Sequence, residues 1–420
     1  MKSMWTCLCE YARREAWGWL PVALLLAVGG TVARADDLTI QSFDGTGRLT
    51  FNELSTATVY RVEWAPTPSG PWTNFTGAAG AALDEIVAKG SGIVTCSVPM
   101  CYRVVASVTN APPPVTEGVY LVVDLSGGPS SPSYPVTYLD AVPAGGWTDE
   151  YKTTKLVLRR IPATSPDFTM GYRATDYPEA SDFGLHQVTL TQDFCIGVFE
   201  ITQRQWELVM GNKPSYFNNA TYYQTRPVEQ VSYYDIRENP ANSDDPAVDW
   251  PNNSAVNATS FMGRLRAKTG KAFDLPTESQ WEYACRAGTT TALNSGYNLT
   301  STSSDARMAE VGRYWYNGGS SCSRNVDTSG ATAKAGSYQP NEWGLYDMHG
   351  NVWEWCLDWY GTYPGTVSDP KGASSGSNRV FRGGGWCYIA YGCRSAYRIN
   401  FSPGYRYFFI GFRAVLPPGQ

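Results

Sequence analysis

Histidine is nearly absent from this chain of 420 residues, which contains only His186 and His349. An iron site that needs two or three histidine ligands therefore cannot be built from well-placed residues of this sequence. A Ser-His-Asp triad would have to use His349, but the sequence lacks the nucleophile elbow that presents such a serine. We therefore expect His349 to have a structural role in a tight turn.

Charged residues are also scarce, at 17% of the chain, and the formal net charge is −5. No basic run stands out, so we expect neither nucleic acid nor an anionic membrane as a partner. Aromatic residues are abundant instead, with 15 Trp and 27 Tyr, and glycine contributes 41 residues. This composition favours short strands and long ordered loops over helical bundles.

A hydrophobic run long enough to span a bilayer is missing as well. The apolar segment WLPVALLLAVGG (19–30) is too short, follows basic residues, and is followed by the small-residue pattern ARA (33–35). These features predict a signal peptide over residues 1–35 and a mature protein that begins at Asp36. A membrane anchor is the weaker alternative, and the protein is expected in a secreted, periplasmic or cell-surface location.

Export changes how the cysteines are interpreted, because an oxidising compartment favours disulfides. Cys96 and Cys101 are separated only by SVPM, which predicts a local disulfide across a turn. The other cysteines of the mature chain are Cys195, Cys285, Cys322, Cys356, Cys387 and Cys393.

The composition and the pattern of apolar residues change along the chain. Alternating apolar and polar residues separated by Gly and Pro predict a small β-sandwich of the fibronectin type III sort over 36–125, with 119–125 as a candidate last strand. Residues 126–152 are rich in turn residues and are expected to form a linker. Residues 153–416 predict one loop-rich α+β domain.

This large domain contains few helical patterns. Three segments are expected to hold helices: 199–211, 254–270 and 275–288. Thr202 is the N-cap candidate of the first, and Gly270 is expected to end the second. Thr277 and Gln280 form a capping box at the start of the third.

Three carboxylates lie inside the aromatic segment WGLYDMHGNVWEWCLDWY (343–360), where an unpaired charge would be costly. They belong to Asp347, Glu354 and Asp358. One interpretation is that they cap nearby backbone or pair with arginines such as Arg382 or Arg394.

The other interpretation of this segment is a calcium site. The turn DMHGN brings Asp347 and Glu354 together, with the backbone carbonyls of Gly350 and Val352 facing the same point. Oxygen-only ligands on an irregular loop suit Ca²⁺, although no EF-hand pattern is present.

Seven segments, in this order, together resemble the formylglycine-generating enzyme or sulfatase-modifying factor family. They are FEITQRQW, RPVEQVSYYDI, LPTESQWEYACRAG, WGLYDMHGNVWEW, FRGGGW, CRSAYR and IGFRAV, and they cover about residues 153–416. The resemblance implies a variant of the C-type lectin fold, which agrees with a loop-rich α+β domain. It also implies calcium bound by Asp347, Gly350, Val352 and Glu354, and a cleft beside Trp353.

The resemblance implies a catalytic centre with two cysteines that bind copper(I), activate O₂ and oxidise a substrate cysteine to formylglycine. Cys387 and Cys393 would be these ligands, and the substrate would be a protein or peptide such as an exported sulfatase. This sequence departs from the family pattern in two ways. Gly385 replaces the serine of "GGS", and five residues instead of four separate the cysteines.

The family also links the cysteine of its "EYxCR" helix to one on the C-terminal strand. Here the resemblance implies a disulfide between Cys285 and Cys393, which would leave Cys387 as a lone thiol. We expect this disulfide rather than the copper pair. The domain would then be a catalytically silent, lectin-like binding module for a peptide or glycan, and about half of its cleft aromatics would instead pack in the core. The candidate cleft residues are Trp353, Trp386, Tyr388, Tyr391 and Tyr397.

Overall fold

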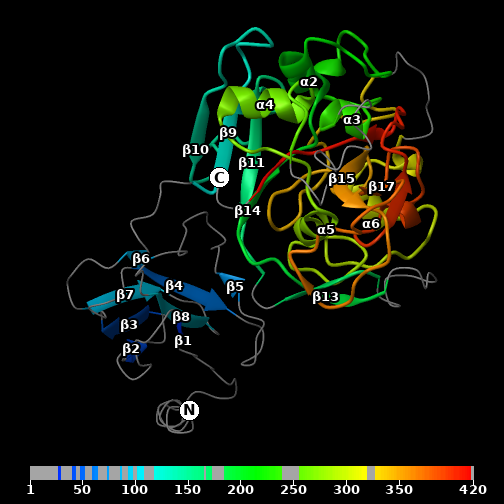
Figure 1. Cartoon of the computed structure of the whole chain (residues 1–420). Helices are drawn as coiled ribbons and strands as arrows, with labels where there is room; N and C mark the ends of the chain where they lie inside the picture. Colours follow the sequence, from blue (N-terminus) through cyan, green and yellow to red (C-terminus); the bar gives the residue numbers. More distant parts are fainter. Residues whose placement is uncertain are drawn as a thin grey trace. The chain divides into compact units, whose positions relative to one another are not determined.

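The computed structural model divides the chain into two compact units, Met1–Val115 and Thr116–Gln420 (Figure 1). It describes residues 118–164, 167–172, 184–238, 255–318 and 327–417, and only the backbone of short strands before residue 108. The signal peptide cleavage site and the side chains of Cys96 and Cys101 lie outside the described residues. Within the described residues, no helix has both the length and the apolar character needed to cross a membrane.

The first unit contains two sheets of short strands. One sheet has the order β1-β8-β4-β5, with β6 also paired to β4, and the other has the order β2-β3-β7. The strands are β1 (Ala27–Gly29), β2 (Ile40–Phe43), β3 (Arg48–Asn52), β4 (Val59–Trp64), β5 (Thr73–Asn74), β6 (Ile86–Val87), β7 (Ile93–Ser97) and β8 (Tyr102–Ser107). The fibronectin type III assignment of this module stays a prediction.

The boundary between the units differs from the expected one. Strand β9 (Tyr120–Asp124) is the neighbour of both β10 (Val136–Leu139) and β11 (Lys155–Ile161), so it belongs to the second unit. Four of its five side chains are buried, because it is an inner strand with both faces covered. The expected linker 126–152 therefore forms part of the domain, and its Tyr134 is only 2% exposed.

The second unit is built on three sheets. The largest has the order β10-β9-β11-β14-β20, in which β20 (Val415–Leu416) brings the end of the described chain beside β14 (Phe194–Gly197). The second has the order β18-β17-β15-β19, with β15 (Trp353–Trp359), β17 (Arg379–Arg382), β18 (Arg398–Phe401) and β19 (Ile410–Gly411). The third joins β12 (Phe168–Met170), β13 (His186–Thr189) and β16 (Val367–Ser368).

The three expected helices are confirmed, as α2 (Gln203–Met210), α4 (Phe261–Thr269) and α5 (Glu278–Arg286). Thr202 caps α2, and Thr277 with Gln280 forms the capping box of α5. Gly270 ends α4 in the left-handed conformation. The sequence analysis did not identify the shorter helices α3 (Tyr233–Ile236), α6 (Ala306–Val311), η1 (Asp149–Lys152), η3 (Tyr223–Thr225), η5 (Trp315–Asn317) and η6 (Ala390–Cys393).

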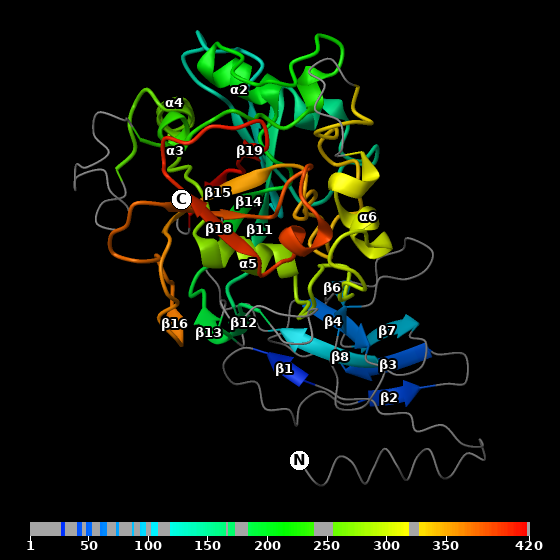
Figure 2. The same cartoon turned by 90° about the vertical axis from the view of Figure 1, so that its right-hand side faces the viewer.

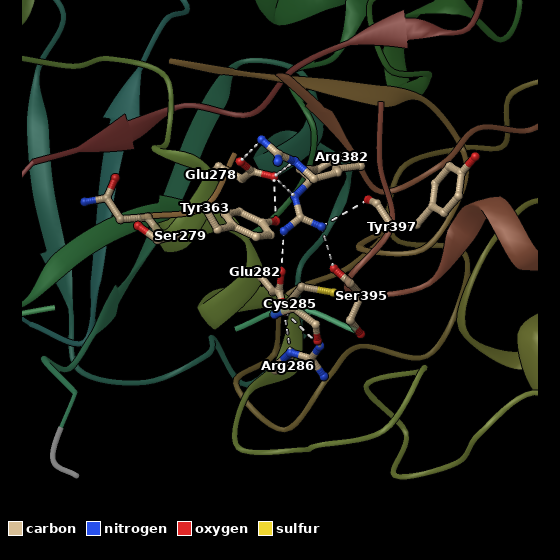
Figure 3. A network of polar contacts seen from close by, with 12 residues as sticks. Glu278, Ser279, Glu282, Cys285, Arg286, Tyr363, Arg382, Ser395 and Tyr397 are labelled. Atoms are coloured by element: carbon tan, nitrogen blue, oxygen red, sulfur yellow. Dashed lines mark hydrogen bonds and ion pairs between the residues drawn. The ribbon is translucent and has the colours of Figure 1, made fainter. Parts of the chain in front are cut away.

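Helix α5 lies against the sheet of β15 and β17 (Figure 2), and a buried arginine ties the two together. The Arg382 guanidinium on β17 pairs with Glu282, and its Nε lies 3.0 Å from Glu278 Oε1. Its Nη1 donates to the backbone carbonyls of Ser395 and Tyr397, each at 3.0 Å (Figure 3). One side chain thus fixes the helix, the sheet and the loop after Cys393 in a common arrangement.

We predict that Arg382→Met lowers the free energy of unfolding by about 1–3 kcal/mol, because it leaves the buried carbonyls of Ser395 and Tyr397 without this donor. It also removes one cation from the buried cluster, in which Glu282 keeps Arg286 and Glu278 keeps Arg398. Urea denaturation of the whole chain measures this loss. The control is Arg160→Met, which removes a pair with Asp193 whose side chains are 43% and 40% exposed and should cost less than about 1 kcal/mol. Equal losses for the two variants would contradict the structural role of Arg382.

Candidate functional site

The segment Asp347–Glu354 forms a compact turn and enters β15. Asp347, Gly350 and Asn351 all have positive φ angles, of 56°, 82° and 59°. A Cβ on Gly350 would lie 1.9 Å from the Arg313 carbonyl oxygen, so only glycine fits there. The turn brings Asp347 close enough to Glu354 for the charge of Glu354 to raise the pKa of Asp347.

Glu354 is held by an arginine that the sequence analysis did not consider. Arg413 donates from Nε to Oε2 and from Nη2 to Oε1, both at 2.6 Å, and Trp281 Nε1 donates to Oε2 at 2.6 Å. Both charged side chains are fully buried. Such a bidentate pair neutralises the carboxylate, so Glu354 has three donors and a counter-charge without any metal.

Asp347 lies in a different environment. Its Oδ2 accepts the backbone N–H of Gly336 at 2.6 Å, but its buried Oδ1 has no hydrogen-bond partner. Burial raises the pKa of Asp347 to about 6, and the Gly336 hydrogen bond opposes this shift only in part. An orphaned carboxylate oxygen is an atom at which a cation or a proton would be stabilised.

Glu200, directly before α2, is the carboxylate that the sequence analysis missed at this site. Its two oxygens accept from Val352 N at 3.1 Å and from Asn351 Nδ2 at 2.6 Å. Burial and then the charges of Asp347 and Glu354 raise its pKa well above the usual range. Glu200 lies in the motif FEIT. Because it is about 150 residues before the turn, its contact with the turn could not be predicted from the sequence.

The other carboxylate of the aromatic segment, Asp358, faces the start of α5. Its Oδ2 accepts the backbone N–H of Glu278 at 2.8 Å. The expectation that these carboxylates cap backbone or pair with arginines is therefore met by Asp358 as a cap and by Glu354 as a pair, but with Arg413 instead of Arg382 or Arg394. Among the described residues, no group of three or more His, Cys, Asp or Glu side chains could hold a metal ion.

His349 links the turn to the cysteine loop. Its Nε2 accepts the backbone N–H of Asn294 at 3.0 Å, so the ring proton lies on Nδ1, which donates to the Cys393 carbonyl at 2.7 Å. Burial lowers the pKa of His349 to about 4, so the ring is neutral at physiological pH. This arrangement agrees with a structural role.

Cys285, Cys387 and Cys393 were expected to form either a catalytic pair or a disulfide, and none of the three is in a disulfide. The Cys285 sulfur lies 3.8 Å from the Met348 carbonyl oxygen and 3.9 Å from His349 Nε2. The Cys393 sulfur instead packs against Gly384 and accepts the N–H of Gly385. The expected disulfide between Cys285 and Cys393 is therefore not formed, because the two sulfurs face different groups.

Cys387 acts on Cys393 electrostatically. Burial raises the pKa of Cys393 to about 12, and Cys387 contributes to the rise. Cys387 itself is only partly buried. The backbone of Gly384 packs against the Cys393 sulfur, because Gly384 has a φ of 82° and a Cβ there would lie 2.5 Å from that sulfur.

The expected aromatic cleft is only partly at the surface. Trp353 and Trp386 are fully buried, and Trp386 Nε1 donates to the Phe408 carbonyl, so neither can line an open cleft. Tyr388, Tyr391 and Tyr397 are partly exposed. The indole rings thus belong to the core, and the tyrosines cover them.

We predict that Cys387 is more reactive than Cys285, Cys356 and Cys393, because these three thiols are buried and the pKa of Cys285 and of Cys393 is about 12. Iodoacetamide labelling of the native chain, followed by peptide mass spectrometry, should modify Cys387 before these three. Labelling after denaturation without reductant should then modify both Cys285 and Cys393. Protection of that pair until a reductant is added would show that they form a disulfide.

Comparisons with known proteins agree with this architecture. The model of the sulfatase-modifying factor enzyme 1-like domain matches residues 161–417. The chaperone protein LppX of Paenibacillus barcinonensis is 33% identical over 224 residues, which cover 49% of this chain and 73% of that protein. The formylglycine-generating enzyme of Thermomonospora curvata is 32% identical over 198 residues, which cover 44% of this chain and 62% of the enzyme.

Other matches differ in their extent and in their names. The serine/threonine-protein kinase pkn1 of Chlamydia pneumoniae is 34% identical over 152 residues, but these cover 34% of this chain and only 20% of the kinase. The structure of Treponema denticola variable protein 1 covers 63% of this chain and 96% of its own, with 29% identity and a TM-score of 0.47. The family model spans more than half of the chain, and the chain therefore belongs to the formylglycine-generating-enzyme-like family of sulfatase-modifying factor domains.

Proposed function

We propose that the second unit of this protein binds an extended segment of another protein at a strip of tyrosines beside Cys387. The strip consists of Tyr388, Tyr391, Tyr397, Tyr405 and Tyr407. The main observation in support is that these partly exposed rings form one continuous series of ring contacts over the buried Trp353 and Phe409.

The ring contacts run along the whole strip. Tyr391 contacts Tyr397 at 5.3 Å between ring centroids, and Trp353 contacts Tyr397 at 6.0 Å and Tyr388 at 5.1 Å. The series continues from Tyr388 through Phe409 to Tyr407 and Tyr405, with separations of 5.5, 4.8 and 6.0 Å. Tyrosines with an apolar ring and a polar tip are typical of surfaces that bind peptides.

Three further observations support binding as the main role. Burial raises the pKa of the Cys393 thiol to about 12, so this sulfur has no thiolate at neutral pH unless a metal displaces its proton. Gly385 also supplies no hydroxyl at the position where active family members carry serine. One relative of this domain is named as a chaperone, a class of protein that binds other chains.

The second candidate function is oxidation of a substrate cysteine to formylglycine, with an exported sulfatase as the substrate. The observation that favours it is that neither Cys387 nor Cys393 is in a disulfide and that Cys387 is close enough to raise the pKa of Cys393. Two sulfur ligands suit copper(I), which would supply the activation of O₂ when bound. The protein would contribute the partly exposed Cys387 and the tyrosine strip that orients the substrate.

We also propose that calcium binds at the turn, with Asp347 as the side-chain ligand and the carbonyls of Gly350 and Val352 beside it. The orphaned Oδ1 of Asp347 fits this role. The carboxylate of Glu354 fits less well, because Arg413 and Trp281 already donate to it. Calcium would offset the mutual repulsion of the buried carboxylates that raises the pKa of Glu200.

We predict that the whole chain, when immobilised, enriches peptides from a phage-displayed random heptapeptide library. Tyr407→Ala should weaken the selected peptides about 10-fold, because an aromatic anchor in such an interface contributes more than about 1 kcal/mol. The control is Tyr222→Ala. Both tyrosines are 38% exposed, but Tyr222 does not belong to the strip. Failure to enrich any peptide would contradict the binding function.

An oxidation assay distinguishes the binding function from the oxidase. The whole chain is loaded with copper(I) and incubated in air with a cysteine-containing sulfatase-motif peptide, and we expect the mass of the peptide to stay unchanged. Conversion of the cysteine, lost in Cys387→Ser, would establish the oxidase instead.

We predict that 1 mM CaCl₂ raises the melting temperature of the chain relative to EDTA, and that MgCl₂ does so less. Asp347→Asn should abolish most of this calcium effect, because it removes the charge at the orphaned oxygen. The control is Asp149→Asn, which changes an exposed carboxylate that pairs with Lys334. An identical calcium response in the wild type and Asp347→Asn would rule out the proposed site.

A further inference from the structure

Arg394 differs from the other buried arginines of the described residues. It is only 1% exposed, and its Nε donates to the Tyr391 carbonyl at 2.9 Å, but neither Nη1 nor Nη2 has a hydrogen-bond acceptor. The terminal nitrogens of Arg226 and Arg313 reach backbone carbonyls. The arginines that pair with carboxylates are Arg237, Arg286, Arg379, Arg382, Arg398 and Arg413.

Three tyrosine rings surround this guanidinium. Its carbon lies 4.0 Å from the ring centroid of Tyr391, 5.0 Å from that of Tyr172 and 5.7 Å from that of Tyr397. Tyr172 is held in place through the preceding Gly171, whose N–H donates to Glu282 and whose carbonyl accepts from Arg286. The rings therefore form a positioned cage.

The cage stabilises the charge of Arg394 but provides no hydrogen-bond acceptor for the N–H groups at the edge of its guanidinium. Aromatic rings attract a cation through their faces, whereas the N–H groups of Arg394 need acceptors in the guanidinium plane. A buried donor left without an acceptor destabilises the folded state. Two such donors, side by side on one planar group, match the two oxygens of a carboxylate.

We propose that the peptide bound along the tyrosine strip carries an aspartate or glutamate whose carboxylate binds Arg394 through Nη1 and Nη2. Tyr391 and Tyr397 belong both to the strip and to the cage, so a ligand on the strip passes over Arg394. Rotation of one of these partly exposed rings admits the carboxylate. This inference rests on the proposed binding function and specifies its ligand as an acidic peptide.

The depth of Arg394 favours a peptide over an acidic glycan. The guanidinium edge lies below the surface rings, where an acidic side chain reaches with one or two methylene groups. A carboxylate attached directly to a sugar ring has no such reach. The chain carries a net charge of −5, so general attraction of acidic ligands does not explain such a preference.

The test uses the peptides selected on the whole chain from the random heptapeptide library. We expect an Asp or Glu at one fixed position of the selected peptides. Replacing that residue by the matching amide should weaken binding to the wild-type protein about 10- to 100-fold, as expected for a charge-assisted bidentate contact. Because the change is in the peptide, this measurement does not depend on the folding of any variant.

Variants of the protein test the residue itself. Arg394→Lys, which keeps the charge but loses the planar fork, should reduce the difference between the acidic and amide peptides. Arg406→Gln is the control, because Arg406 is an exposed arginine beside two strip tyrosines and pairs with Asp235. It should leave that difference unchanged.

Each other outcome has a definite meaning. Selected peptides without a fixed acidic position, or equal affinity for the acid and its amide, overturn this inference and leave the binding function standing. No selected peptide at all refutes the binding function itself. Binding of acidic sugars without any peptide binding refutes the choice of a peptide as the ligand.

Discussion

The arrangement of the site depends on the buried ion pairs between α5 and the β17 strand. A helix of nine residues and a strand of four are too short to be stable alone. Arg382 joins them by pairing with Glu278 and Glu282, and it also binds the backbone of the loop that follows Cys393. Because the charges are fully buried, each partner fixes the other, and a shift of the helix would leave a charge unpaired in the core.

This constraint explains how a domain dominated by loops positions its side chains closely. The turn at Asp347–Glu354 is fixed through Glu354 and Arg413, and the cysteine loop is fixed through Arg382 and the neutral ring of His349. Two loops that are distant in sequence are thereby held by hydrogen bonds and ion pairs instead of regular secondary structure. The tyrosine strip lies on this support, so its rings are presented by an ordered backbone.

The sequence predicted the local features well. The capping residues Thr202, Thr277 and Gln280 mark helix starts through contacts within three residues, and such contacts are visible in a sequence. The family resemblance placed the turn and the cysteine loop. It could not show that Arg413 and not Arg382 neutralises Glu354, because that contact joins residues 59 positions apart. The same limit hid the contacts of Glu200 with the turn and of Tyr172 with Arg394.

The domain boundary and the cysteine pairing failed for related reasons. Strand β9 follows a segment of alternating apolar and polar residues and precedes a turn-rich segment, so its sequence suggested that it closes the first module. Its pairing with β11 assigns it to the second unit instead. The partner of Cys393 depends on which way its sulfur points. Gly384, in the left-handed conformation, allows the backbone to approach the Cys393 sulfur, and the spacing of residues alone does not reveal this approach.

The position of Arg413 and β20 relative to β14 has a consequence for folding. Arg413 donates to the Gly197 carbonyl across 216 positions of the chain, and β20 pairs with β14 over a similar separation. Contacts between such distant segments form slowly, because the entropy of closing a long loop is lost before the contact is gained. The edge of the main sheet and the counter-charge of Glu354 are therefore added late, after local elements such as α5 have formed.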